Sequence, residues 1–480
     1  MPLSLHPSAQ QVSAIELARY RERLAGVNPV LSHGSVRQVV GLLVEVDGLA
    51  GQLGELCRIS RVGAEPVLAE IVGLREQRTL VMPFGDLRGV QSGARVTADG
   101  GLFTVPVGDQ LLGRVIDGLA RPIDNRGPLV GPSRQALAAQ SPPALQRRTI
   151  SEPLATGVRA IDGALTVGKG QRIGVFAGSG VGKSTVMAMI ARHASSDVNV
   201  IALVGERGRE VREFVERALG EDGLARSVVV VATSDEPALL KMQAAMVATT
   251  IAEAFRAQGR DVTLLMDSVT RYAMANREIG LAIGEPPTMK GYPPSVFSAL
   301  SRLLERAGTS EEGTITAFYA VLVESDDLSE PITDAVRGTL DGHIVLTREL
   351  AAQNHFPAID LLQSTSRVMP SIVTSEHLDA AGRLRELLAI YERSRDLVTI
   401  GAYQAGTDPR LDEALARLPA IEAFLRQRPN DAQPLDETVA ALLAVTGGQA
   451  TPTRSLHLVP NIEDDERAAD AVIDLPPEIE

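Results

Sequence analysis

The chain has 480 residues, 44% of them hydrophobic and 22% charged, which is enough for about two to four domains with buried cores. A formal net charge of −13 argues against a protein that mainly grips nucleic acid, because such proteins present a basic surface. The single cysteine, Cys57, excludes a disulfide framework and a cysteine-based metal cluster, and no apolar run is long enough to form a membrane-spanning helix.

The first segment, residues 1–34, begins without the charged start and apolar core of a secretory signal. Together with the lone cysteine, this indicates a protein of the reducing cytoplasm. Within the segment, residues 9–25 predict a short helix, because Leu17, Tyr20 and Leu24 recur at helical spacing. The helix either packs on the next domain or contacts a partner or a membrane surface.

Residues 35–106 predict a small closed β-barrel, because short β-rich runs alternate with glycine-rich turns at short intervals. The runs are "VVGLLVEV", "LCRIS", "PVLAEIVGL", "TLVMPF", "ARVTADG" and "LFTVPVG".

Residues 107–375 change to an alternation of strands and helices, which predicts an α/β domain with a parallel sheet covered on both faces. The predicted strands are "QRIGVFAG", "VNVIALVG", "SVVVVAT" and "DVTLLMD". The predicted helices are "KSTVMAMIARHA", "REVREFVERALG", which Gly220 should end, and "ALLKMQAAMVATTIAEAFRAQG".

Residues 376–447 predict a helical domain, since Leu384, Leu387, Leu388 and Tyr391 share one helical face and good strands are lacking. Residues 448–480 are rich in proline and acidic residues and predict an acidic, disordered tail.

The stretch "AGSGVGKST" follows a predicted strand and precedes a predicted helix, the context in which a P-loop binds nucleotide phosphates. Its glycines let backbone N–H groups turn toward phosphate oxygens, and the helix that follows points its N-terminus at the same anion. We expect Lys183 to reach the β- and γ-phosphates and the Ser184 hydroxyl to bind Mg²⁺. Ala177 replaces the usual first glycine, which is tolerable if its φ is negative. The expected phosphate-binding residues are Gly178, Ser179, Gly180, Val181, Gly182, Lys183, Ser184 and Thr185.

Two carboxylates end predicted strands of the same sheet. Asp267 follows four apolar residues and should lie beside the P-loop, where it can hold Mg²⁺, while Glu206 ends an intervening strand. A carboxylate at the second position can polarise the water that attacks the γ-phosphate, although a structural role for Glu206 stays open at this point. Arg207 and Arg209 are either phosphate sensors or helix-start ion-pair partners.

Several motifs together resemble the type III export ATPases, relatives of the catalytic subunit of rotary ATP synthases. The resemblance covers roughly residues 25–445 and is strongest to the flagellar branch. It is carried by "AGSGVGKST", "GERGREVREF", "LLMDSVTRYAMANREIG", "GEPPTMKGYPPSVF", "GTITAFYAVLVESDD", "LDGHIVLTREL" and "FPAIDLLQSTSRVM". Export ATPases commonly carry alanine at the position of Ala177.

The resemblance implies a RecA-like P-loop domain in a homohexameric ring, with a nucleotide site at each subunit boundary. Glu206 matches the catalytic carboxylate, Arg207 the neighbouring phosphate-contacting arginine and Glu210 a supporting acid. Arg367 in "STSRVM" matches an arginine that reaches the γ-phosphate of the adjacent subunit. A cation supplied in trans offsets charge that develops in the transition state.

Three aromatic residues and one loop complete the expectations. Phe356 matches an aromatic that packs on adenine, with a core position as the alternative, and for Tyr403 and Phe424 we favour packing over contact with the base. The segment 284–295, "GEPPTMKGYPPS" with Lys290, matches the part of rotary relatives that faces the ring axis. It is either a contact for a central stalk or passing substrate, or a plain surface loop.

We therefore expect a cytoplasmic ATP hydrolase that uses ATP and Mg²⁺, is peripherally associated with an inner-membrane export apparatus, and energises chaperone release and export of flagellar proteins. The expected partners are a stator-like peripheral regulator, a central stalk protein, export chaperone–substrate complexes and the membrane export gate, with no nucleic acid. The alternatives are an injectisome ATPase, a rotary ATP synthase subunit, a non-catalytic ring subunit and an RNA-translocating ring ATPase. The presence of Glu206 disfavours the non-catalytic subunit, and the acidic charge disfavours the RNA translocase.

Overall fold

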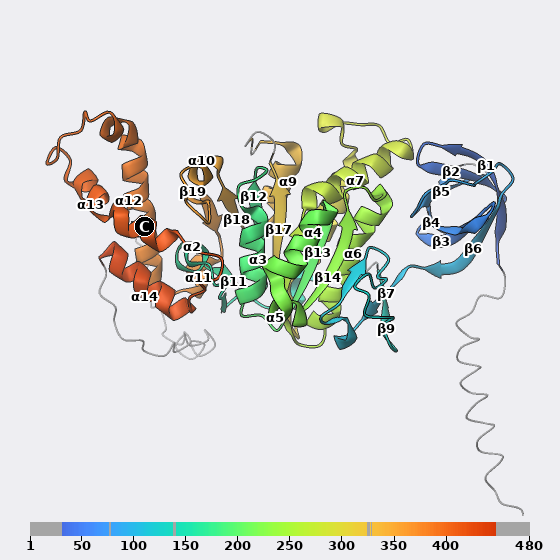
Figure 1. Ribbon diagram of the computed structural model, residues 1–480, viewed down its shortest axis with the longest axis horizontal. Coiled ribbons are helices and arrows are strands. Elements are labelled where there is room, and N and C mark those ends of the chain that lie inside the picture. The colour runs from blue at the N-terminus through green and yellow to red at the C-terminus, as the bar shows by residue number, and fades with distance from the viewer. Residues whose placement is uncertain (1–30, 76–77, 138–140, 324–326, 328, 448–480) are drawn as a thin grey trace, which may run out of the picture.

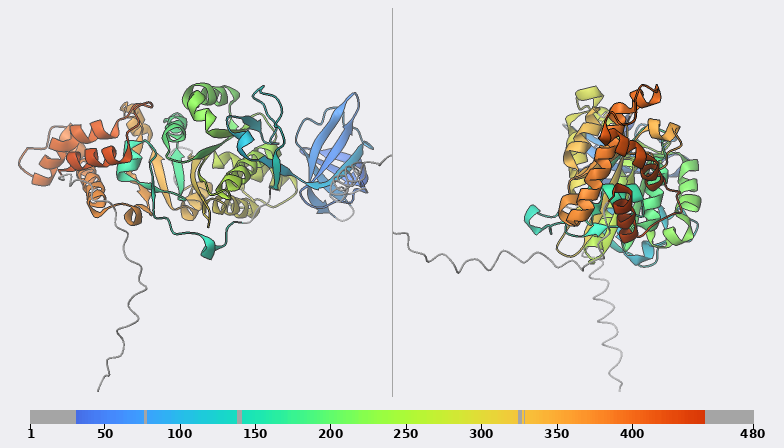
Figure 2. Two further views of the ribbon diagram at one scale, coloured as in Figure 1. Left: turned by 90° about the horizontal axis from the view of Figure 1, so that it is seen from below. Right: turned by 90° about the vertical axis from the view of Figure 1, so that its left-hand side faces the viewer.

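The computed structural model describes residues 31–75, 78–137, 141–323, 327 and 329–447. The helix expected over residues 9–25 and the tail expected over residues 448–480 lie outside this part of the chain. The described residues form an elongated molecule with a β-barrel at one end, a helical region at the other and an α/β sheet between them (Figures 1 and 2). No helix of the described part is both long and apolar enough to cross a membrane.

The N-terminal barrel closes in the strand order β1-β2-β5-β4-β3-β6. Its strands are β1 (His33–Val40), β2 (Leu43–Asp47), β3 (Glu55–Arg61), β4 (Ala64–Arg75), β5 (Arg78–Pro83) and β6 (Arg95–Leu102). Alternate residues of these strands, among them Val44, Val46, Cys57 and Ile59, fill the interior, as strand periodicity requires. The prediction of a small barrel is confirmed.

Two of the predicted barrel runs behave differently from expectation. The run "VVGLLVEV" is not one strand, because Gly41, with φ +58°, makes a turn between β1 and β2. The run "LFTVPVG" leaves the barrel, because β7 (Thr104–Val107) pairs with β9 (Ser133–Ala136) in a separate two-stranded sheet.

The central sheet has the order β19-β18-β12-β17-β15-β13-β14-β8. Its strands are β8 (Val115–Asp117), β12 (Arg172–Ala177), β13 (Val198–Glu206), β14 (Ser227–Thr233), β15 (Asp261–Asp267), β17 (Thr314–Leu322), β18 (Gly342–Leu346) and β19 (Ile359–Ser366). The pairs along this order are parallel except the one between β18 and the edge strand β19. Short strands β10 (Pro153–Leu154) and β11 (Val167–Gly168) pair with each other, and β16 (Gly308–Thr309) pairs with β17.

Helices cover both faces of the sheet, which explains why its strands read as continuous apolar runs. On β13, Val200 and Ala202 pack toward α6 (Ala238–Arg256), while Ile201 and Leu203 pack toward α3 (Lys183–His193). The remaining helices of the domain are α2 (Arg159–Ala164), α4 (Gly208–Glu213), α5 (Gly220–Ala225), α7 (Val269–Ala282), α8 (Pro294–Glu305), α9 (Pro331–Thr339), α10 (Arg348–Ala352) and α11 (Met369–Ile372).

The helix predicted to end at Gly220 is longer and less regular than expected. After α4 the chain widens into a π-helical turn, Phe214–Leu219, and resumes as α5. Gly220 has φ +70°, so it breaks the helical geometry locally without ending the helical segment. The C-terminal region is helical as predicted, with α12 (Ser375–Thr399), α13 (Pro409–Leu425) and α14 (Leu435–Thr446) packed against α2 (Figure 1).

Candidate active site

The loop 178–182 connects the buried strand β12 to α3 at the carboxyl edge of the sheet. Gly180 and Gly182 have φ values of +81° and +95°, a left-handed backbone that glycine adopts without strain. No side chain caps the N-terminus of α3, so its first N–H groups face the loop. Ala177 is a buried strand residue without a positive φ, so its methyl group fits where the common motif has glycine.

Three charged side chains meet behind this loop. Lys183 begins α3, Glu206 ends β13 and Asp267 ends β15, and the two strands are neighbours in the sheet. The Lys183 ammonium donates a hydrogen bond to Asp267 Oδ1 and lies 3.8 Å from Glu206 Oε1. All three side chains are largely shielded from solvent. The carboxyl ends of parallel strands therefore bring together one buried cation and two carboxylates.

Glu206 is held in a state that favours its protonated form. Burial raises the pKa of Glu206 to about 8, the nearby Asp267 charge adds to the rise, and the Lys183 ammonium opposes it. A carboxyl group with a pKa near neutrality can accept a proton from water and release it again, which is what a general base needs.

The space in front of these groups is large and lined by cations. A cavity of about 1080 Å³ is lined by the P-loop, by Glu206 and Arg207, and by Arg271, Lys290 and Arg348. An adjoining cavity of about 550 Å³ continues between α3 and the π-helical turn, and its lining includes Ser184 and Asp267. A hydroxyl and a carboxylate are hard oxygen donors of the kind that Mg²⁺ prefers, so this corner fits a magnesium ion.

Arg271 is one of the cavity residues that the sequence analysis did not single out. It lies in the first turn of α7 and packs its alkyl chain against Gly205, where an added Cβ would lie 2.8 Å from Arg271 Cγ. Its Nε is buried, and no described residue accepts a hydrogen bond from it. A buried donor at the cavity wall favours an anionic ligand. The signal in the sequence was its position four residues after Asp267, on the helix that follows the same strand.

The two arginines that the sequence left undecided have different surroundings. Arg207 lines the cavity and pairs with Glu210 at 3.1 Å. Arg209 pairs with Glu213 at 2.8 Å one turn along the helix, outside the lining of the large cavity. The helix-start ion pair thus accounts for Arg209, while Arg207 combines an ion pair with a place at the cavity.

The aromatic candidates separate in the same way. The Phe356 side chain is 42% exposed and lies beside the P-loop, since a Cβ at Gly182 would be 3.7 Å from its ring. Phe424 is buried against Gly163, and the Tyr403 hydroxyl donates to Asp412 Oδ1 at 2.8 Å. Phe356 is therefore an exposed ring beside the P-loop and not a core residue, whereas the other two side chains have structural contacts, as we favoured.

Arg367 lies away from its own P-loop. Its backbone N–H donates to Asp341 O at 3.0 Å, beside the end of the sheet where β12 begins with Arg172. The P-loop follows the other end of β12, roughly 16 Å away at about 3.3 Å per residue. Arg367 is exposed and is absent from the lining of both cavities described above. The structure therefore does not bring it together with Lys183, Glu206 and Asp267 of the same chain.

The segment 284–295 includes an exposed stretch and borders the cavity. Residues 286–290 are exposed, Lys290 lies 3.9 Å from Glu330, and Lys290 and Tyr292 line the large cavity. Lys290 has φ +45° within a short 3₁₀ turn, Met289–Gly291. The segment is thus a surface loop that also reaches the site.

A P-loop, carboxylates at neighbouring strand ends and a parallel sheet covered by helices define a P-loop nucleotide-binding protein of the RecA type. Comparisons with known proteins specify the class. The nucleotide-binding domain of the ATP synthase alpha/beta family matches residues 157–366, its beta-barrel domain matches residues 36–100, and the T3SS EscN ATPase C-terminal domain matches residues 373–444.

Similar proteins cover nearly the whole of this chain. The "Flagellum-specific ATP synthase" of Bacillus subtilis is 53% identical over 419 residues, 87% of this chain and 96% of the relative. The "Type 3 secretion system ATPase" of Xanthomonas euvesicatoria is 52% identical over 86% of this chain and 94% of the relative. The assembled ATPase EscN of enteropathogenic E. coli matches with a TM-score of 0.82 and 48% identity, over 86% of this chain and 100% of EscN. The chain therefore belongs to the family of flagellar and type III secretion ATPases.

Proposed function

We propose that the protein is a Mg²⁺-dependent ATP hydrolase that energises protein export through a type III apparatus. The observation that carries the proposal is the meeting of Lys183, Glu206 and Asp267 at a large, cation-lined cavity. The family supplies the setting, since its flagellar and secretion members are about equally similar to this chain.

In this mechanism the P-loop amides of residues 178–185 cradle the phosphates, and Lys183 exchanges its Asp267 partner for phosphate oxygens. Ser184 and Asp267 would hold Mg²⁺, which neutralises charge on the phosphates when it is bound. Glu206 orients the attacking water and takes its proton. Arg207 and Arg271 add positive charge at the cavity wall, and Phe356 stacks on the adenine.

We further propose that each site is completed by Arg367 of a neighbouring subunit in a homohexameric ring. The distance of Arg367 from its own P-loop supports this, because the side chain faces solvent at another part of the sheet. A structure of assembled EscN and one of EscN with its central stalk EscO belong to close relatives of this chain. By analogy, we propose that a central stalk protein contacts the segment 284–295, whose residues 286–290 are exposed.

The remaining partners follow from the same proposal. The N-terminal segment 1–34 would bind a stator-like peripheral regulator, and the protein would act in the cytoplasm at the membrane export gate, where it releases export substrates from their chaperones. We propose the flagellar apparatus as the first candidate, with the injectisome as the alternative. Expression in a strain that lacks its flagellar ATPase and in one that lacks its secretion ATPase separates the two, because rescue of motility or of effector secretion names the apparatus.

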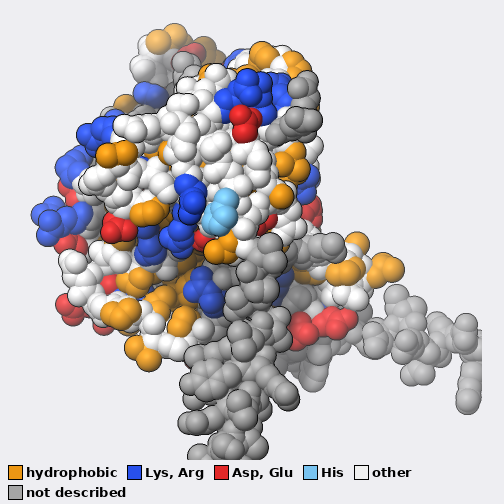
Figure 3. Space-filling model, turned by 90° about the vertical axis from the view of Figure 1, so that its right-hand side faces the viewer, with side chains coloured by type: hydrophobic (Ala, Val, Ile, Leu, Met, Phe, Trp, Pro, Cys, Tyr) orange, Lys and Arg blue, Asp and Glu red, His pale blue; other side chains and the backbone are white. Residues whose placement is uncertain are grey.

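The barrel surface disfavours the RNA-translocase alternative. Figure 3 shows basic side chains on this end of the molecule interspersed with hydrophobic and acidic ones. Arg58 pairs with Asp99 at 3.1 Å and Arg78 with Glu45 at 2.8 Å, so their charges are offset. The aromatic rings of the described barrel region belong to phenylalanines that are buried, which leaves no platform there for base stacking. If RNA strongly stimulated ATP turnover, the protein would be an RNA translocase and the export proposal would be wrong.

Steady-state ATP hydrolysis by single variants tests the proposed chemistry. Lys183→Ala and Glu206→Gln should each lower kcat by at least about 100-fold, the usual contribution of a positioned base or phosphate cation. Glu216→Gln removes the same charge from an exposed helix ion pair nearby, outside both cavities, and should keep kcat within about twofold. Near-normal hydrolysis by Glu206→Gln would remove the catalytic assignment.

Mixed rings test the arginine in trans. Rings of Arg367→Ala alone and of Lys183→Ala alone should be inactive, whereas mixed rings contain interfaces with an intact P-loop facing an intact arginine. Turnover should therefore return in the mixture. Assembled mixed rings without recovered turnover would contradict the role of Arg367.

A further inference from the structure

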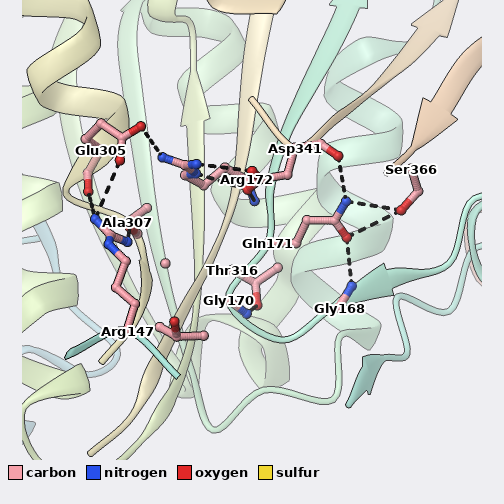
Figure 4. Close-up of polar contacts among 12 residues, drawn as sticks. Arg147, Gly168, Gly170, Gln171, Arg172, Glu305, Ala307, Thr316, Asp341 and Ser366 are labelled. Carbon is pink, nitrogen blue, oxygen red and sulfur yellow. Dashed lines mark hydrogen bonds and ion pairs between the residues drawn. The ribbon is translucent and has the colours of Figure 1, made fainter. Parts of the chain in front are cut away.

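A polar network lies beside Arg367, at the start of strands β12 and β18 (Figure 4). We call it the Arg172 network, and it consists of Arg147, Gln171, Arg172, Glu305, Asp341 and Ser366. None of these residues lines the nucleotide cavities described above, and the chemistry proposed for the site does not use them.

The centre of the Arg172 network is a two-pronged ion pair. Arg172 Nε and Nη2 donate to Asp341 Oδ2 and Oδ1 at 3.0 and 3.1 Å, and the Arg172 backbone N–H donates to Oδ2 at 3.0 Å. The remaining guanidinium nitrogen, Nη1, lies 2.6 Å from Glu305 Oε1. The two parallel hydrogen bonds to Asp341 fix the planar guanidinium better than a single-point contact would, while Glu305 adds an ion pair without hydrogen-bond geometry.

One side of the Arg172 network ends at Arg367. Asp341 O accepts the Arg367 backbone N–H at 3.0 Å and the Gln171 Nε2–H at 3.2 Å. The same Gln171 nitrogen donates to Ser366 Oγ at 3.1 Å, and Ser366 Oγ donates to Thr166 O at 2.9 Å. The Ser366 side chain and the Arg367 backbone N–H are therefore both fixed, directly before the Cα atom that carries the Arg367 side chain.

The other side of the Arg172 network ends at α8. Glu305 is the last residue of this helix, and Arg147 binds both the Glu305 carboxylate and, at 2.8 Å, the Ala307 carbonyl. Helix α8 begins at Pro294, within the segment 284–295 and four residues after its exposed stretch 286–290.

We propose that the Arg172–Asp341 pair is a positioning device that sets Arg367 for the active site of the neighbouring subunit. The proposal rests on the proposed function of Arg367 in trans. An arginine that stabilises a transition state must be held close to its productive position, because small displacements cost large factors in rate. The pair supplies this rigidity from outside the nucleotide site.

The proposal predicts a defect in the neighbour's site and none in the subunit's own P-loop. Full-length Asp341→Asn keeps the size of the side chain and weakens its hold on Arg172. Uniform rings of this variant should show kcat lowered by about tenfold with the KM for ATP within about twofold, because only the transition state loses a contact. Ser366→Ala, a smaller change, should lower kcat by about threefold in the same manner.

Mixed rings locate the defect. In an equal mixture with Lys183→Ala, about half of the intact P-loops of Asp341→Asn subunits face an undisturbed Arg367. Turnover per Asp341→Asn subunit should therefore rise about fivefold over uniform Asp341→Asn rings if the tenfold loss arises in trans. Turnover per Ser366→Ala subunit should also rise when this variant is mixed with Lys183→Ala.

Asp124→Asn is the matched control. Asp124 binds Arg114 at 2.7 and 3.0 Å in a two-pronged pair, with a more shielded carboxylate than Asp341, near β8 at the opposite end of the strand order from β19. Its loss should lower thermal stability as Asp341→Asn does, but turnover per Asp124→Asn subunit should show no rise on mixing.

The outcomes separate this proposal from the one on which it rests. If Arg367→Ala recovers on mixing but neither Asp341→Asn nor Ser366→Ala does, the positioning role is wrong and Arg367 still acts in trans. If Arg367→Ala itself fails to recover in assembled rings, the trans role is wrong and the positioning role falls with it. An unchanged kcat in uniform Asp341→Asn and Ser366→Ala rings also overturns the positioning role.

Discussion

Gly205 offers the sharpest test of the site geometry, because two separate constraints require a glycine there. Its φ is +74°, in the left-handed region that other L-residues rarely adopt. An added Cβ would also lie 2.8 Å from Arg271 Cγ and 2.9 Å from Arg271 Cβ, closer than real contacts allow. Gly205→Ala must therefore strain the end of β13 and displace the first turn of α7.

The expected size of the effect follows from these two constraints. The left-handed backbone costs roughly 1–2 kcal/mol of folding stability. The steric overlap shifts Arg271, and the strain falls next to Glu206, so the groups proposed to contact phosphate and water lose their relative position. A displacement of about 1 Å at reacting groups can cost on the order of 100-fold in rate, and we expect that loss in kcat.

Substitutions at two other glycines distinguish the effect of backbone strain from the effect of the steric clash with Arg271. Gly220 has φ +70° with no atom within 4 Å of an added Cβ, so Gly220→Ala should lower the melting temperature but keep kcat within about threefold. Gly208 has open space and no positive φ, so Gly208→Ala should change neither quantity appreciably. If folded Gly205→Ala hydrolyses ATP within threefold of the unmodified protein, the placement of Arg271 against the strand end does not matter for turnover.

Three further predictions concern the residue proposed to stack on adenine, the proposed general base, and a buried carboxyl group. Phe356→Ala should raise the KM for ATP about tenfold with kcat within twofold, and Phe356→Tyr should restore it, because stacking is worth about 1–3 kcal/mol; equal KM values for all three proteins would contradict base stacking. The kcat/KM for ATP should rise about tenfold between pH 6 and pH 7 and continue to rise toward pH 9, because Glu206, with a pKa of about 8, acts only when ionised; a flat profile would contradict its role as base. Burial raises the pKa of Asp162 to about 6, so the folded state binds its proton more tightly than the unfolded state. That contribution, on the order of 3 kcal/mol, is complete below about pH 4 and lost as the pH rises through 6, so the melting temperature should fall more for the unmodified protein than for Asp162→Asn between pH 4 and pH 7.

The fold could be predicted from the sequence wherever local chemistry and periodicity agree. The strands "SVVVVAT" and "DVTLLMD" were predicted with the bounds found in β14 and β15, because continuous apolar runs ending in polar residues leave little choice. The run "VVGLLVEV" was misjudged because Gly41 folds it back on itself, which only the barrel pairing reveals. The segment after Thr104 was misplaced for a similar reason, since its partner β9 is distant in sequence and weakly patterned.

The site residues also differ in whether local sequence patterns were enough to predict them. Motif spacing and the rule that parallel strands share a carboxyl edge were enough to expect Lys183, Glu206 and Asp267 at one place. Arg271 was missed because its position depends on a contact with Gly205 across 66 residues, which no periodicity encodes. Arg367 could be singled out only by resemblance, since an arginine after a strand is unremarkable until its distance from the P-loop is known.

Strand β19 gives the proposed ring a direct mechanical link between successive sites. Phe356, three residues before the strand, lies at the P-loop of its own subunit, while Arg367 directly follows the strand's last residue, at the opposite edge of the sheet from that loop. Because β19 runs antiparallel to β18 along the edge of the sheet, one continuous strand joins the residue proposed to stack on one nucleotide to the arginine proposed for the next. Its antiparallel direction is what makes this possible, since a parallel edge strand would bring the residue after its end to the same edge as the P-loop. A displacement of β19 at Phe356 would therefore act on the same strand that ends beside Arg367.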